Sequence, residues 1–126
     1  MDGINSLADL DPSYKKVDKW KPKKLEKHYD MERGLVTAIR STISRLEAMN
    51  QSYLDRASEL VGETVTTESM HEYIEDVREK AILVELKSID QFILTTVKDL
   101  DAERKRLHHH QRISELLLKM IKDKSI

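Results

Sequence analysis

The sequence predicts an all-α protein: a long antiparallel helical hairpin of coiled-coil type, preceded by a short N-terminal helix. Charged residues make up 36% of the 126 residues, with only 3 Gly and 2 Pro, a composition typical of long solvated helices. Apolar residues recur every three and four positions through two long stretches, and no run alternates at period two as a strand would. Both observations favour helices over sheets.

The first stretch predicts a helix over about 22–61, which is roughly 60 Å long at ~1.5 Å per residue. Pro22 can open it and Gly62 can end it in the left-handed conformation. A helix of this length needs a partner for its apolar seam. The seam consists of Leu25, Tyr29, Glu32, Val36, Ile39, Ile43, Leu46, Asn50, Tyr53, Ala57 and Leu60.

A turn over 62–68 and a second helix over about 69–122 follow, because Ser69 and Glu72 form a capping-box pattern. Two helices joined by a short turn should fold back on each other. With the turn centred on Val65, facing residues sum to about 130, which places Glu32 opposite Lys98 and Pro22 near His108. Asn50 is either a partly exposed seam position or a residue that specifies register or oligomeric state.

Residues 1–21 predict a tail and a short helix, and 22–126 the hairpin. Asp11 and Pro12 are a helix-start signal, so the short helix should run from Pro12 to about Trp20. In the register above, residues 109–126 project beyond the first long helix with an unpartnered apolar stripe. The N-terminal segment should therefore fold over the tail of the second helix, or over that of another chain.

Residues 82–94 hold eight apolar side chains in thirteen, more than a helix with one partner needs. Either a third helix covers them, or they form an interface between chains. We favour self-association into a dimeric four-helix bundle. The expected interface residues are Leu83, Val84, Phe92 and Leu94.

Two basic segments, Lys15–Lys27 and Arg104–Arg112, should meet at the open end of the hairpin in the predicted register. Such an end could contact phosphate, with Tyr14, Trp20 and Tyr29 as stacking surfaces. Nucleic-acid binding is therefore the alternative function. The expected contact residues are Lys19, Lys23, Lys24, Lys27, Arg104, Lys105, Arg106 and Arg112.

No pattern in the sequence indicates a catalytic, cofactor or metal site. His108, His109 and His110 point about 100° apart on a helix, so we expect solvated histidines rather than metal ligands. Arg104 and His109 fit a short R-x4-H pattern found in some helical RNA-cleaving domains, which leaves a small nuclease as a minor alternative. No apolar run is long enough to span a membrane. We expect a non-catalytic cytoplasmic scaffold or adaptor that binds protein partners and itself.

Overall fold

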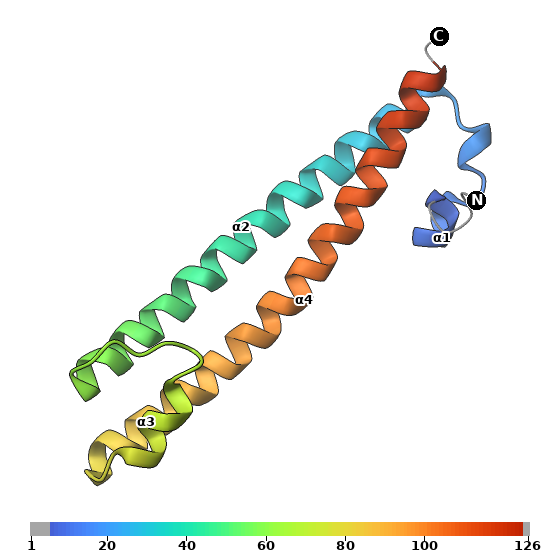
Figure 1. The fold of residues 1–126 in the computed structure, drawn as a ribbon. Helices are drawn as coiled ribbons and strands as arrows, with labels where there is room; N and C mark the ends of the chain where they lie inside the picture. The colour runs from blue at the N-terminus through green and yellow to red at the C-terminus, as the bar shows by residue number, and fades with distance from the viewer. Residues whose placement is uncertain (1–5, 125–126) are drawn as a thin grey trace. The chain divides into compact units, whose positions relative to one another are not determined.

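The computed structural model describes residues 6–124, and every regular element in that range is helical (Figure 1). The all-α prediction is confirmed, and the two long helices pack against each other as a helical hairpin. In chain order the elements are α1 (Leu7–Leu10), the 3-10 turns η2 (Pro12–Tyr14) and η3 (Val17–Lys19), α2 (Pro22–Val61), α3 (Met70–Asp76) and α4 (Lys80–Lys124).

The chain forms two compact units. Unit 1 takes in the chain up to Ser41 and from Arg104 onward, and unit 2 is Thr42–Glu103. Each unit therefore contains part of α2 and part of α4, and each has its own buried apolar cluster.

The helix α2 occupies the span that the sequence predicts, and the chain leaves it through Gly62. This glycine has a φ of +77°, the left-handed conformation that residues with a Cβ adopt at a cost. Its N–H donates to the carbonyl of Ser58, which satisfies one of the last helical acceptors. The predicted glycine cap is confirmed.

The second predicted helix is wrong as a single element, because the chain breaks between α3 and α4. Val77 is extended, with a φ of −69° and a ψ of 126°. At 100° per residue, a continuous helix would place Met70, Tyr73 and Val77 on the side opposite Leu86 and Ile93. The break lets both sets reach one core: in unit 2 they pack together against Leu54 and Ala57 of α2.

This break moves the register of the hairpin by about twelve residues. Glu32 lies against His110 and Arg56 lies against Glu85, so facing residues sum to about 142 rather than 130. The predicted pairing of Glu32 with Lys98 is wrong. The physical reason is that residues 62–79 form the loop, α3 and the break after it, so α4 begins only at Lys80.

The capping box at the start of α3 is also wrong. The helix begins after Ser69, as predicted, but the Ser69 hydroxyl makes no capping bond. It instead accepts from the backbone N–H of Thr66, at 2.9 Å, and so fixes the preceding turn.

In unit 1 the N-terminal segment packs on α4 of the same chain, as one of the two sequence alternatives predicts. Leu7, Tyr14 and Val17 share a buried cluster with Ile113 and Leu117. The predicted single helix over Pro12–Trp20 is replaced by η2 and η3. The Asp11 carboxylate accepts from the N–H of Ser13 at 2.9 Å and caps η2. The expected tail includes residues 1–5, which lie outside the described residues.

Candidate interaction surfaces

The lysines of the N-terminal segment and early α2 form a basic surface in unit 1. Lys21, Lys23, Lys24 and Lys27, together with His28, line an open hollow of about 550 Å³. The four lysines are exposed, and so is Lys19. This half of the expected phosphate-contact set therefore has the exposure that the prediction requires.

The aromatic residues beside these lysines are occupied by contacts within the chain. The Trp20 ring lies 4.5 Å from the His28 ring and 5.4 Å from the Tyr14 ring, between centroids, and Lys24 Nζ sits 4.3 Å from its centroid. Tyr14 is 4% exposed. The Tyr29 hydroxyl accepts from Arg33 at 2.9 Å. Burial excludes the stacking of bases on Tyr14, whereas Trp20 and Tyr29 remain partly exposed.

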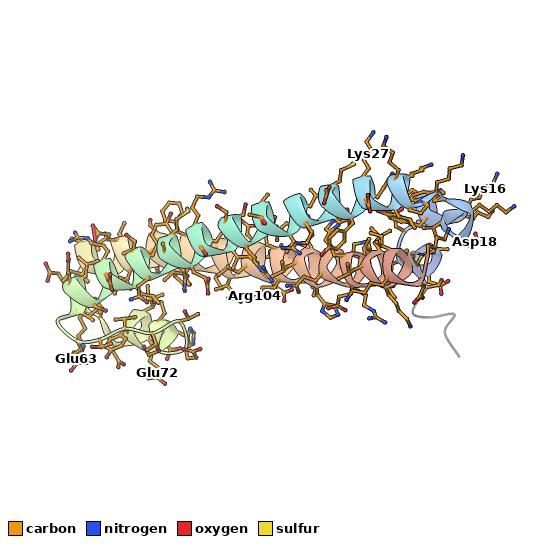
Figure 2. The ribbon with its side chains drawn as sticks, turned by 90° about the horizontal axis from the view of Figure 1, so that it is seen from above. Lys16, Asp18, Lys27, Glu63, Glu72 and Arg104 are labelled. Carbon is orange, nitrogen blue, oxygen red and sulfur yellow. The ribbon has the colours of Figure 1, made fainter. Side chains whose placement is uncertain are left out.

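Three residues of the second basic group, Arg104, Lys105 and Arg106, do not lie opposite the first group as the predicted register required. Figure 2 shows Lys27 and Arg104 well apart along unit 1. Each of the three residues Arg104, Lys105 and Arg106 makes an interaction within the chain. Arg112, the last residue of the expected set, donates to Glu115 at 3.3 Å. With Glu32 against His110, Arg104 lies opposite residue 38, whereas Arg112 lies opposite residue 30, within about one helical turn of Lys27. The change of register therefore moves Arg104, Lys105 and Arg106, but not Arg112, away from the lysines.

Unit 2 carries most of the exposed apolar side chains in the described part of the protein. Val84 is 60% exposed, Phe92 53% and Leu94 56%. Leu83, the fourth residue of the expected interface, is only partly exposed. Two residues along a helix rotate by about 200°, so Phe92 and Leu94 lie on opposite flanks of α4. One flat partner cannot cover both.

On the flank of α4 that carries Phe92, side chains of α2 extend the apolar surface. The rings of Phe92 and Tyr53 stack, with centroids 5.3 Å apart and planes 13° apart. Met49, 40% exposed, lies one turn before Tyr53 on α2. We call Met49, Tyr53 and Phe92 the Phe92 patch.

A buried polar cluster in unit 1 centres on Glu32 of α2 and His110 of α4. Glu32 is 7% exposed, and its Oε1 accepts a hydrogen bond of 2.7 Å from Nδ1 of His110. His110 is therefore not the solvated histidine that the sequence predicts, although His108 is exposed. Sequence reasoning identified Glu32 as the charged residue of the seam but, without the correct register, not its partner.

The pKa values of Tyr14 and Asp11 are shifted by burial, hydrogen bonding and the charges of this cluster. Burial raises the pKa of Tyr14 to about 12, and the negative charges of Glu32 and Asp11 act in the same direction. The pKa of Asp11 is lowered, first by the hydrogen bond from the Ser13 backbone N–H. The charges of His109 and His110 also lower it. The hydrogen bond between Glu32 and His110 links α2 to α4, and their charges act on Tyr14 and Asp11 of the N-terminal segment.

Two buried polar atoms lack hydrogen-bond partners among the described residues: Oδ1 of Asn50 in unit 2 and Oγ of Ser114 in unit 1. Ser114 lies beside a groove of about 320 Å³ whose lining includes Arg33, Arg40 and Gln111. The lining also includes the carboxylate of Glu115, so the groove carries charges of both signs, and because Ser114 Oγ is closed to solvent it presents no open hydroxyl. In the described residues, no three His, Asp or Glu side chains are placed to hold a metal ion.

No protein-family model, curated protein or solved structure matches this chain. Within residues 6–124, no helix combines the length and apolar character that crossing a bilayer requires.

Proposed function

We propose that this protein is a non-catalytic helical scaffold that binds protein partners, including a second copy of itself, through the exposed apolar side chains of α4. The observation that supports this is that Val84, Phe92 and Leu94 are each more than half exposed. Large apolar side chains grouped on one short helical stretch are typical of protein–protein contact surfaces. Its proposed place of action is the cytoplasm.

Size-exclusion chromatography with light scattering tests the proposal. We expect a wild-type dimer at micromolar concentration, and we expect at least one of the two variants Phe92→Glu and Leu94→Glu to yield monomer by burying an unpaired charge. The matched control is Gln91→Glu, which adds the same charge at an exposed polar position of α4. A wild-type monomer across the micromolar range would remove the proposal of self-association.

Nucleic-acid binding is the second candidate, and the lysine-lined hollow of unit 1 is the observation that favours it. Lysine acts on phosphate as a point charge, so affinity should fall steeply with salt and depend little on base sequence. An electrophoretic shift assay at low salt with single- and double-stranded DNA and RNA tests it.

Replacing Lys23 and Lys24 with Gln should weaken such binding more than replacing Arg104 and Arg106, because the latter pair lies away from the hollow and already has partners. No shift with any nucleic acid at tens of micromolar protein would leave the scaffold proposal alone.

A further inference from the structure

We propose that the occupant of the Phe92 patch is a second copy of this chain in antiparallel arrangement, with unit 1 of one copy against unit 2 of the other. This inference rests on the proposed self-association and adds to it the face, the orientation and the role of charge.

Formal charge divides sharply between the two units. The segments 1–41 and 104–126 hold 16 Lys and Arg against 9 Asp and Glu, a formal charge of +7. Residues 42–103 hold 6 against 14, a formal charge of −8, and the two add to the −1 of the whole chain. Of the residues labelled in Figure 2, Lys16 and Lys27 belong to unit 1, and Glu63 and Glu72 belong to unit 2.

This division decides between two orientations of a dimer. A parallel pair would bring +7 against +7 and −8 against −8, whereas an antiparallel pair brings each basic unit against an acidic one. Complementary potentials speed association and fix the relative orientation of partners, while like charges oppose it. In a two-fold dimer, a contact of unit 1 in one copy with unit 2 of the other occurs twice.

The apolar side chains of the two units can complete this contact. In unit 1, Met31 is 54% exposed and Leu35 38% exposed. Lys24 and Lys27 precede Met31 by seven and four residues, so they share its face of α2. Unit 1 therefore presents an apolar pair next to lysines, a surface that fits an apolar patch beside carboxylates.

Unit 2 presents the matching chemistry around the Phe92 patch. Glu85 and Asp99 lie seven residues before and after Phe92, and therefore on the same face of α4. Glu85 already pairs with Arg56 at 3.0 Å, which holds its carboxylate at the edge of the patch. An aromatic and methionine centre with a charged rim has the composition of an interface core and its border.

Crosslinking of single-cysteine chains tests the orientation, since the natural chain has no cysteine. Lys27→Cys and Ser88→Cys change exposed positions that each lie four residues before an apolar centre, Met31 and Phe92 respectively. A short bis-maleimide should link Lys27→Cys chains to Ser88→Cys chains in a mixture, and should link neither variant to itself. Preferential links between identical variants would overturn the antiparallel arrangement.

Two further measurements test the face and the role of charge. Phe92→Glu should raise the dimer dissociation constant at least ~100-fold, whereas Leu94→Glu, on the opposite flank, should leave it within about threefold. Raising NaCl from 50 to 500 mM should raise the constant at least ~10-fold. A dimer that responds only to Leu94→Glu, or that is unaffected by salt, would overturn this inference while leaving self-association intact. A wild-type monomer would instead contradict the proposed function.

Discussion

At the scale of single residues, the hydrogen bond between Glu32 and His110 is the single contact whose loss we expect to matter most for stability. A carboxylate that is 7% exposed is costly to leave without a donor. His110→Ala should therefore lower the free energy of unfolding by about 2 kcal/mol, measured by urea denaturation. Replacing both residues with Leu should restore most of it, because no polar group is then stranded. Exposed His108→Ala is the control, and an equal effect there would contradict the role of the bond.

Tyr14 gives a pH-dependent prediction from the same cluster. Its pKa of about 12 in the folded state exceeds the ordinary value of 10.0, so folding favours the protonated phenol. That stabilisation is fully present below pH 10 and is lost as the pH rises through 12. Tyrosinate absorbance should show one phenol ionising near pH 12, and Tyr14→Phe should remove it. Persistence of that transition in the variant would assign it to another tyrosine, such as Tyr73, whose pKa is also raised by its hydrogen bond to Glu63.

At the scale of elements, two glycines associated with α2 should respond in opposite ways to alanine. A Cβ at Gly34 meets no atom within 4 Å, so Gly34→Ala should raise the free energy of unfolding by about 1 kcal/mol through helix propensity. Gly62 has a φ of +77°, and Gly62→Ala should lower it by about 1 kcal/mol despite equal space. Thermal or urea unfolding of the two variants checks the sign. Stabilisation by Gly62→Ala would contradict the left-handed cap.

The helix α2 could be predicted from sequence because its start, seam and end all lie within one continuous pattern. The break after α3 could not be read from any proline or glycine, since the chain has neither after Gly62. Its signal was the phase of the apolar residues: Met70, Tyr73 and Val77 fall on the opposite side from Leu86. Such a reversal shows that both sets cannot reach one core from an unbroken helix. Missing it displaced the register, and with it the partner of Glu32 and the position of Arg104.

At the scale of the whole molecule, the charged surface was more predictable than its arrangement. The lysines of 15–27 are exposed because a charged side chain is rarely buried without a partner, so their exposure could be predicted from residue type alone. Whether they meet Arg104 depends on where α4 begins, which is set by packing around α3. The net charge of −1 is thus the sum of one positively and one negatively charged unit. The register between α2 and α4 determines which charged residues are neighbours.

The two buried clusters should also give the units separate stabilities. Leu117 in unit 1 and Leu86 in unit 2 are each fully buried, so truncation to Ala at either site should cost about 2–5 kcal/mol locally. Because each cluster draws on its own segments of α2 and α4, we expect partial unfolding rather than one all-or-none transition. Amide hydrogen exchange should therefore accelerate mainly in residues 6–41 and 104–124 for Leu117→Ala, and mainly in residues 42–103 for Leu86→Ala. Equal acceleration throughout the chain in both variants would show instead that the continuous long helices make unfolding a single cooperative step.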